Sequence, residues 1–502
     1  MVNRNELCDR LSLEDDSLSH FSIDDCQKCA PAAGYRYGTS SNNVGSNGNY
    51  WSSTPNEDND NNAYNLNFNS DNYDWNWNNR NNGQSVRPVL ELTPTFHSAS
   101  SHFTISKEQL LKDLYRAYKD ARKHKQSRLY QLKFEYNLEA NIVELRDELI
   151  TGTYKPKPSI CFIIHDPKMR EVFAANFRDR IVHHLFYNYT HQLFENTFIY
   201  DTYSCIKNRG THFGVSRLKH HILSVSNNYK SPCYILKIDI KGYFMHINRR
   251  VLYDICVETL NKMACHIESD GNRWKDEIDY PFVYYLLDAI INVNPMDNCM
   301  ILGNREEWKL LPKDKSMVCA KEDCGLPIGN LSSQLFSNIY LNRFDQFVKR
   351  ELKCKHYGRY VDDAYIVSNN SQELLALVPK VRCFLKEKLY LDVNQDKLLI
   401  YDAKYGVEFL GAFIKPFRTY LSRDTSNRLK SKLRGAKWQD VMSMRASINS
   451  FLGVMAHHSS YSERRMLFGC HKIISKYGRF NAGWCKYIVD ILDRRNLLRE
   501  DY

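Results

Sequence analysis

Two adjacent aspartates between apolar residues place the tightest constraint on the fold of this chain. Asp362-Asp363 follows Tyr360-Val361 and precedes the apolar run 364–367. This pattern is typical of two antiparallel strands joined by a tight turn, with the acidic pair at the turn. Neighbouring side chains on a strand point to opposite faces, so a carboxylate from another strand is needed to complete a site on one face. Taken alone, an Asp-Asp pair is more often an ordinary turn.

Asp239 has the right setting to be the partner of that pair. It lies near the end of the run 234–240, which is apolar and β-branched enough to predict a buried strand. Carboxylates in an apolar setting repel one another and are costly to bury without a cation. Magnesium prefers oxygen ligands, and two such ions clamp the attacking and leaving oxygens of a phosphoryl transfer. The sequence therefore predicts that Asp239, Asp362 and Asp363 hold two Mg²⁺ ions.

The charge of the chain is divided between its two parts. Residues 1–100 hold 6 Lys and Arg against 13 Asp and Glu, whereas residues 101–502 hold 63 against 45. A positive excess favours partners that carry phosphate, although many basic domains bind none. With 502 residues and 43% hydrophobic residues, the chain is long enough for two or three units.

The fifteen cysteines are scattered along the chain. Cys26 and Cys29 form the only closely spaced pair, and no second pair completes a zinc site. The start of the chain lacks the basic and then apolar pattern of a signal peptide, and no run approaches the ~18 to 20 apolar residues that cross a bilayer. We expect free thiols, no membrane contact and a cytoplasmic location.

Beyond residue 105 the periodicity of apolar residues predicts a mixture of helices and strands. Ser106 with Gln109 resembles a helix-capping box. From Arg428 onward the pattern indicates helices alone. The other expected elements are helices at 106–124, 136–150, 176–193, 331–348 and 374–389, and strands at 234–240 and 364–367.

Residues 34–90 differ in composition from the rest of the chain. Between Asn42 and Gly83, seventeen of 42 residues are Asn, interleaved with aromatic residues. No apolar period is sustained, so a low-complexity polar tract and a set of short strands both remain open.

The motifs around the aspartates resemble those of reverse transcriptases. The segment 360–363 (YVDD) is similar to motif C of that family, and 239–244 (DIKGYF) is similar to motif A. Further matches follow in the family's order, which is difficult to obtain by chance. They are 325–334, similar to motif B, 394–397, similar to motif D, and 408–411, similar to the primer-grip turn.

This resemblance implies an α+β right-hand polymerase with fingers, a palm with an antiparallel sheet, and a helical thumb. The boundaries it implies are 1–100 for a poorly ordered acidic extension, 101–415 for fingers and palm, and 416–502 for the thumb. It implies catalysis by Asp239, Asp362 and Asp363, with the Ile240 backbone as a further metal ligand and Mn²⁺ as an alternative ion. Its expected substrates and partners are dNTPs, an RNA template and a DNA or RNA primer.

The resemblance also implies roles for other side chains. Phe244 would exclude a ribose 2′-OH, and Lys397 would protonate the departing pyrophosphate. Basic helices with interleaved aromatic residues between 423 and 479 suit a template-primer groove. The expected nucleotide or template contacts are Lys168, Arg170, Arg178, Gly329, Gln334 and Lys397, and the expected thumb contacts are Arg428, Lys432 and Arg434.

Motif B has the form GxxxSQ at 329–334, which resembles enzymes of diversity-generating retroelements with a group II intron-like palm. Residues 48–54 and 81–89 resemble the variable end of a C-type-lectin-like target protein. Those elements mutate adenines during copying, and Asn codons begin with two adenines, so residues 34–90 are interpreted as a translated template repeat. A small basic helical accessory protein is then expected. The alternatives are a defence-associated or unclassified bacterial reverse transcriptase, and a lectin-like or RNA-binding module without catalysis.

Overall fold

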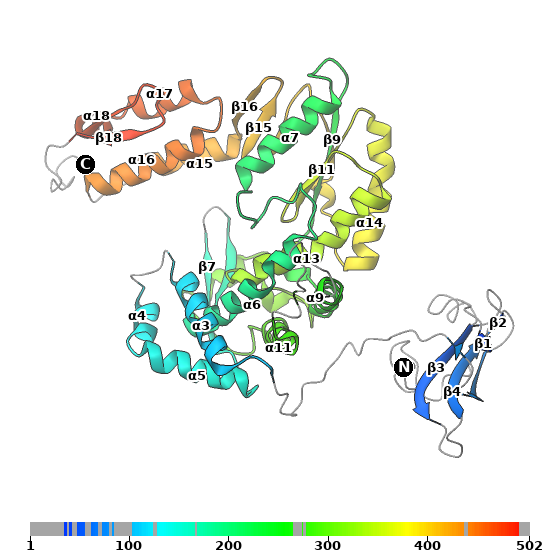
Figure 1. Cartoon of the computed structure of the whole chain (residues 1–502). Helices are drawn as coiled ribbons and strands as arrows, with labels where there is room; N and C mark the ends of the chain where they lie inside the picture. Colours follow the sequence, from blue (N-terminus) through cyan, green and yellow to red (C-terminus); the bar gives the residue numbers. More distant parts are fainter. Residues whose placement is uncertain are drawn as a thin grey trace. The chain divides into compact units, whose positions relative to one another are not determined.

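The computed structural model describes residues 103–123, 128–165, 168–264, 274, 278–435 and 440–490, and the backbone of six strands between 35 and 84. The chain divides into two compact units, Met1–His97 and Ser98–Tyr502. Figure 1 shows the ribbon and the labels of the elements.

The first unit contains two small antiparallel sheets. One has the order β2-β1-β6, and the other has the order β3-β4-β5 with a bulge between Trp51 and Pro55. The Asn-rich composition left strands and a low-complexity tract open, and the structure has strands here. They are β1 (Tyr35–Tyr37), β2 (Ser40–Asn42), β3 (Gly48–Pro55), β4 (Asn62–Phe68), β5 (Tyr73–Asn79) and β6 (Gly83–Gln84).

The second unit begins with helices, most of which pack around one large apolar core. The Ser106 hydroxyl accepts a hydrogen bond from the Gln109 backbone at 3.1 Å, so the predicted N-cap is confirmed. Helix α4 was not predicted, because its apolar residues are largely exposed and follow no period. These helices are α3 (Lys107–Arg122), α4 (Leu129–Glu135), α5 (Leu138–Ile150), α6 (Phe177–Glu195), α7 (Thr211–Val225), α8 (Tyr243–His246), α9 (Arg249–Ala264) and α11 (Tyr280–Ile291).

A four-stranded antiparallel sheet of order β11-β12-β9-β13 forms the centre of this unit. Its strands alternate between two cores, as a sheet covered on both faces requires. Ile238 and Ile366 pack into the larger core with α13 (Leu331–Gln346), whereas Ile235 and Val367 pack into a second core with α7. The strands are β9 (Tyr234–Asp239), β11 (Tyr357–Tyr360), β12 (Asp363–Ser368) and β13 (Leu399–Asp402).

Two smaller sheets flank this central sheet. One has the order β10-β7-β8, in which β10 runs parallel to β7, and the other has the order β14-β15-β16. Their strands are β7 (Ser159–Ile164), β8 (Arg170–Ala174), β10 (Cys299–Ile301), β14 (Val407–Phe409), β15 (Ala412–Lys415) and β16 (Arg418–Leu421).

Helices and short helical turns connect these strands. The long helices at 331–346 and 371–389 and the strand at 363–368 confirm the predicted elements to within a few residues. The connecting elements are α12 (Glu307–Leu310), η2 (Lys313–Lys315), η3 (Met317–Cys319), α13 (Leu331–Gln346), the π-helical turn η4 (Phe347–Glu351), α14 (Ser371–Leu389) and η5 (Gln395–Lys397).

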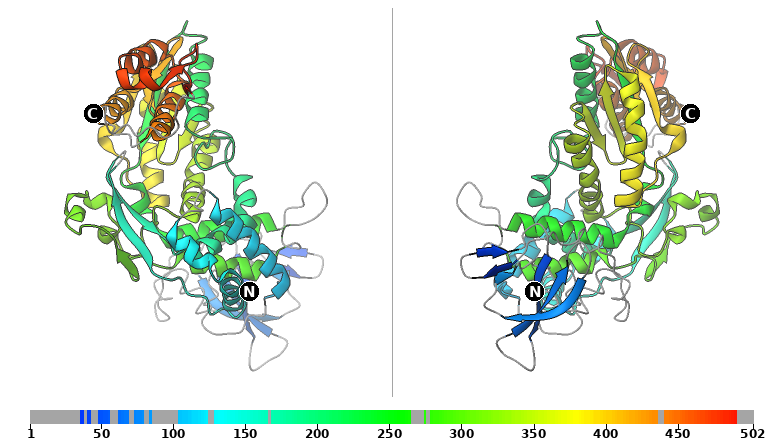
Figure 2. Two further views of the ribbon diagram at one scale, coloured as in Figure 1. Left: turned by 90° about the vertical axis from the view of Figure 1, so that its left-hand side faces the viewer. Right: turned by 90° about the vertical axis from the view of Figure 1, so that its right-hand side faces the viewer.

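The C-terminal part, from Leu421 onward, has its own apolar core. It lies next to the sheet that contains β16 (Figure 2). The expectation of helices alone from Arg428 is wrong, because β17 (Gly478–Phe480) pairs with β18 (Tyr487–Val489). The turn between them is held by the Asn481 side chain, which accepts from the backbone of Cys485 at 2.8 Å. The helices are α15 (Arg423–Arg434), α16 (Val441–Met455), α17 (Tyr461–Gly469) and α18 (Lys472–Tyr477).

The predicted mixture of helices and sheets is confirmed for the described residues. Their helices include none that combines the length and apolar character needed to cross a bilayer.

Candidate active site

The three aspartates meet at one end of the central sheet. Asp363, the first residue of β12, pairs directly with Asp239, the last residue of β9. Paired residues on antiparallel strands project to the same face, so these two carboxyl groups are neighbours. Asp362 lies in the two-residue turn between β11 and β12. The turn and the third strand predicted from the sequence are therefore both present.

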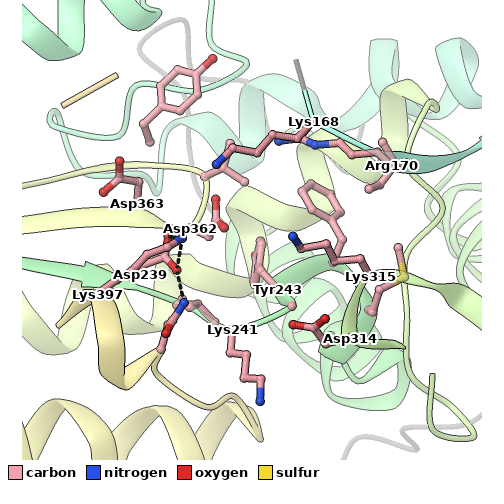
Figure 3. Close-up of a pocket in the computed structure, with 18 of the residues that line it drawn as sticks. Lys168, Arg170, Asp239, Lys241, Tyr243, Asp314, Lys315, Asp362, Asp363 and Lys397 are labelled. Atoms are coloured by element: carbon pink, nitrogen blue, oxygen red, sulfur yellow. Dashed lines mark hydrogen bonds and ion pairs between the residues drawn. The ribbon is translucent and has the colours of Figure 1, made fainter. Parts of the chain in front are cut away.

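The aspartates line a cleft of about 580 Å³ (Figure 3). Strand β8, the turn after β9, the segment before η3 and the β11–β12 turn all contribute to its wall. The predicted site residues that line it are Lys168, Arg170, Asp239, Ile240, Phe244, Asp362, Asp363 and Lys397.

The carboxyl groups of the acidic pair are electrostatically destabilised. Burial raises the pKa of Asp363 to about 6, and the charges of Asp362 and Asp239 act in the same direction. Lys237 opposes this rise, with its Nζ 3.5 Å from Asp363 Oδ1. Burial and the charge of Asp239 also raise the pKa of Asp362. The positive charge of Lys237 thus offsets only part of the cost of burying these carboxyl groups next to one another.

Asp239 is held by residues from the motif near 394–397. Lys397 Nζ lies 3.1 Å from both carboxylate oxygens of Asp239. Asn394 donates to Asp239 Oδ2 at 3.2 Å, and its backbone donates to the Asp239 backbone oxygen at 2.8 Å. These bonds fix the position of a side chain that is only partly buried.

The chemistry of these side chains fits a divalent cation. Asp363 Oδ1 is buried without a hydrogen-bond partner, and Lys397 already places one positive charge against Asp239. Carboxylate oxygens are the ligands that Mg²⁺ prefers. Within the described ranges no three His, Cys, Asp or Glu side chains lie close enough to form an assembled metal site. The fit therefore rests on the type of the donors and on Asp363 Oδ1, whose contact with Lys237 at 3.5 Å is an ion pair without a hydrogen bond.

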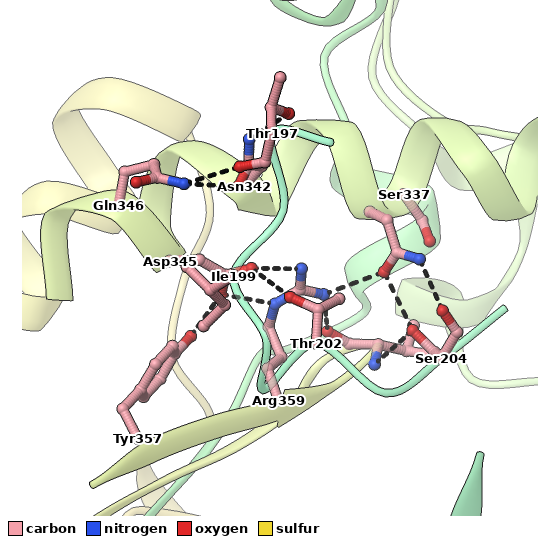
Figure 4. Close-up of polar contacts among 12 residues, drawn as sticks. Thr197, Ile199, Thr202, Ser204, Ser337, Asn342, Asp345, Gln346, Tyr357 and Arg359 are labelled. Atoms are coloured by element: carbon pink, nitrogen blue, oxygen red, sulfur yellow. Dashed lines mark hydrogen bonds and ion pairs between the residues drawn. The ribbon is translucent and has the colours of Figure 1, made fainter. Parts of the chain in front are cut away.

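A strained turn carries Asp362. Val361 has φ +53°, which a β-branched residue rarely adopts. Arg359 Nη1 donates to the Val361 oxygen at 2.8 Å, and the Val361 backbone donates to Ser204 Oγ at 3.2 Å. The Arg359 guanidinium is fully buried and forms bonds of 2.8 and 2.7 Å to the two oxygens of Asp345 (Figure 4). The ion pair with Asp345 thus fixes Arg359, which in turn holds the Val361 carbonyl of the turn.

Three predicted contact residues do not line the cleft. Arg178 is buried, pairs with Glu148, and lies 5.1 Å from the ring centre of Tyr154. Gly329 has φ +125°, and a Cβ there would lie 2.9 Å from the Phe173 oxygen, so its glycine allows this turn to pack on β8. Gln334 is an exposed residue of α13.

The predicted thumb contacts share one helix. Arg428, Lys432 and Arg434 are exposed on α15, whereas Leu429 and Leu433 on the same helix are buried. This arrangement leaves a basic face toward the surroundings.

Sequence reasoning missed three polar residues of the cleft, Lys241, Asp314 and Lys315. Lys241 lies two residues after Asp239, and this spacing could have indicated it. In Figure 3 its side chain points away from the carboxylates. Asp314 and Lys315 carry no such signal, because they lie 75 residues or more from Asp239 in an irregular segment.

Comparison with known families identifies part of this region. Residues 296–414 match the family model described as reverse transcriptase (RNA-dependent DNA polymerase). Residues 21–89 match a model described as a domain of unknown function. The first match includes Asp362 and Asp363 and begins after Asp239. The chain is 23% identical to protein YkfC of Escherichia coli (strain K12) over 304 residues, 53% of this chain and 69% of that protein.

Solved structures of telomerase show a weaker likeness. Apo telomerase from Candida tropicalis, truncated from its C-terminal domain, has a TM-score of 0.39 at 13% identity, covering 53% of this chain and 55% of that one. Telomerase from Candida albicans with a fragment of telomeric RNA has a TM-score of 0.38 at 11% identity, covering 69% and 61%. The chain thus spans little more than half the length of these proteins, and TM-scores this low carry no weight for its fold.

The family match supports the prediction of an RNA-directed DNA polymerase domain, and it does so for residues 296–414.

Proposed function

We propose that this RNA-directed DNA polymerase makes cDNA from an RNA template, with Asp239, Asp362 and Asp363 as its catalytic carboxylates. The observation that carries the proposal is the pairing of Asp363 with Asp239 in a cleft lined by both acidic and basic side chains, with Asp362 in the adjoining turn. Few structural roles would reward placing three mutually repelling, partly buried carboxyl groups at one sheet edge.

The aspartates would hold two Mg²⁺ ions, or Mn²⁺, with the Ile240 backbone as a further ligand. When bound, the ions would supply the positive charge that stabilises the attacking and leaving oxygens of phosphoryl transfer. Lys397 would give its proton to the departing pyrophosphate. Phe244, which lines the cleft, would lie against the sugar and exclude a 2′-OH. Lys168 and Arg170 would bind phosphate oxygens.

The rest of the molecule would hold the nucleic acid. We assign fingers and palm to 101–415 and the thumb to 416–502, with the basic face of α15 against the template-primer duplex. Gln334 on α13 would contact the template or the nucleotide. The exposure of Arg428, Lys432 and Arg434 along one helix supports a backbone contact that ignores sequence.

Primer extension on an RNA template with Mg²⁺ and four dNTPs tests this function. The intact chain is compared with a variant carrying Asp362→Ala and Asp363→Ala, and both are checked for folding by circular dichroism. Synthesis by the intact chain and its loss in a folded variant are expected. A folded intact chain that extends no primer, with or without neighbouring small basic proteins, would instead favour a non-catalytic RNA-binding role.

We further propose that the enzyme serves mutagenic retrohoming in a diversity-generating retroelement. The GxxxSQ form of 329–334 and the Asn-rich segment 34–90, taken as a translated template repeat, support this assignment. A small basic helical accessory protein and a cytoplasmic location belong to the same proposal. Sequencing of the cDNA is the test, and errors concentrated opposite template adenines are expected. Accurate copying would favour a defence-associated or other bacterial reverse transcriptase.

A further inference from the structure

The cleft contains a cation that no motif predicts. Lys315 ends the turn η2 and lines the same wall as Arg170 and Phe244. In Figure 3 its side chain extends into the cleft beside Tyr243, toward the side on which Asp362 lies. The described residues include an ion pair for Lys397 with Asp239 but none for Lys315. A long exposed cation that is directed into the cleft and has no ion pair among the described residues is suited to an anionic ligand.

The segment that carries Lys315 is fixed to the strand that carries Arg170. Glu171 is fully buried and accepts from the Met317 backbone at 2.6 Å and from Trp308 Nε1 at 2.6 Å. It also accepts from the Ser316 hydroxyl at 3.4 Å. Glu171 thus holds both ends of the segment 308–317 against β8.

Strand geometry explains how β8 places Arg170 in the cleft and supports the segment of Lys315. Adjacent side chains on a strand point to opposite faces. Arg170 is exposed and lines the cleft, whereas Glu171 is turned into the interior beside Met317 and Trp308. One strand therefore presents a cation directly and fixes a second cation through the buried carboxyl group.

The same segment also rests on the turn that follows Asp239. Gly242 has φ +54°, and a Cβ there would lie only 2.6 Å from the Asp314 backbone oxygen. The Lys315 backbone donates to the Pro312 oxygen at 2.9 Å, which closes the turn. The contact with the turn after Asp239 and the bonds to Glu171 on β8 therefore fix the backbone of Lys315 relative to both Asp239 and Arg170.

We propose that Lys315 binds the triphosphate of the incoming nucleotide and that Glu171 is its positioning residue. This inference rests on the proposed polymerase function and names a contact that the motifs do not contain. The cleft has five Lys and Arg against four Asp among its lining residues, so it carries little net charge by itself. With two divalent ions bound it gains four positive charges, which suits a triphosphate. A template backbone contact is the competing possibility.

Single-nucleotide insertion distinguishes a contact of Lys315 with the triphosphate from a contact with the template backbone. In Lys315→Ala, the KM for the dNTP is expected to rise about tenfold or more, because a charge-assisted phosphate contact is lost. The Kd for template-primer is expected to stay unchanged. Lys315→Arg should restore most of the affinity. Lys313→Ala removes the same charge from the same turn outside the cleft, and it should leave both constants unchanged.

A binding measurement without turnover completes the design. The full chain is bound to a template with a dideoxy-terminated primer, and the concentration of the next dNTP that stabilises this complex is measured. Lys315→Ala should shift that concentration about tenfold. Trp308→Phe, which keeps an aromatic side chain but removes the Nε1 donor to Glu171, should shift it in the same direction by a smaller factor, as should Glu171→Gln if it folds.

Each outcome decides one question. A wild-type chain that inserts no nucleotide overturns the polymerase function itself. An active wild type in which Lys315→Ala behaves like Lys313→Ala overturns the triphosphate contact alone. An unchanged dNTP KM with weaker and less salt-dependent template-primer binding assigns Lys315 to the template backbone and likewise overturns the proposal.

Discussion

Arg359 Nη1 donates to the backbone oxygen of Val361 at 2.8 Å, and this bond joins the turn that carries Asp362 to a buried ion pair. A fully buried arginine needs its carboxylate partner, because an unpaired charge in the interior is costly. The buried ion pair thus stabilises a turn in which Val361 adopts an unfavourable positive φ.

We expect Arg359→Ala to destabilise the second unit by about 3–5 kcal/mol, since it leaves Asp345 buried without a cation. It should also lower kcat in excess of the unfolded fraction, because the Val361 turn loses its support. Chemical unfolding and single-nucleotide insertion on the folded fraction measure the two effects.

Arg350→Ala serves as the control, because Arg350 is exposed nearby on η4 and its loss should change stability by less than about 0.5 kcal/mol. An Arg359→Ala protein of normal kcat once folded would show that the turn holds Asp362 without this ion pair.

The pKa of Asp363 predicts an unusual dependence of stability on pH. In the metal-free protein this pKa is raised to about 6 from the ordinary 3.8. The folded state therefore binds this proton more tightly than the unfolded state, so the contribution to stability is complete below about pH 4 and is lost as the pH rises through 6. Asp363→Asn should be more stable than wild type at pH 7.5, by on the order of 1 kcal/mol, and equal to it near pH 4.

Unfolding of both proteins across this range, without and with Mg²⁺, measures the difference. Added Mg²⁺ should raise the Tm of the wild type more than that of Asp363→Asn. If Mg²⁺ shifted both Tm values equally, or if the wild type were the more stable protein without metal at pH 7.5, the ionised carboxylate of Asp363 would not destabilise the fold as expected.

Removal of the Lys397 side chain should lower the catalytic rate but raise the affinity for Mg²⁺. The Lys397 side chain is 56% exposed, so its ion pair with Asp239 contributes at most about 1 kcal/mol to stability. Lys397→Ala should lower kcat by about 10² or more, through loss of a proton donor, and should reduce the Mg²⁺ concentration needed for half-maximal rate. Titration of single-turnover rates with Mg²⁺ measures both. A variant that needs more Mg²⁺ would assign Lys397 a role in holding Asp239 for the metal.

Phe244 should govern sugar selection. It lines the cleft and packs edge to face against Tyr243, with ring centres 5.4 Å apart. Phe244→Ala is expected to raise kcat/KM for ribonucleotides relative to dNTPs by about tenfold or more, because the space for a 2′-OH opens. Phe244→Tyr keeps the bulk and should retain the selectivity of the wild type. Unaltered selectivity in Phe244→Ala would place the sugar elsewhere.

The sequence predicted the centre of the site because its information is local. The run 234–240 and the pair Asp362-Asp363 each indicate a strand or a turn by themselves, and the register then brings Asp363 opposite Asp239. The contact of Lys397 with Asp239 spans 158 residues and was not predicted, because the family resemblance implied only a role for Lys397 toward the departing pyrophosphate.

Other features depend on contacts that no local pattern contains. Lys315 reaches the cleft only because the buried Glu171 fastens its segment to β8. The guanidinium of Arg178 is suited to bind phosphate, yet it pairs with Glu148 in the interior. Strands β17 and β18 are only three residues each, and their pairing follows from the Asn481 turn and not from a long apolar run.

A double-mutant cycle on nucleotide insertion tests the central claim most directly. Single-turnover rates are compared for wild type, Asp239→Asn, Asp362→Asn and the combination, with Glu351→Gln, an exposed residue, as the control. If the carboxylates act together, each single change should lower the rate by about 10³ or more, and the combination should cost little beyond either one. Small, additive losses, or a folded Asp362→Asn protein of normal rate, would contradict the assignment of these aspartates as the catalytic centre.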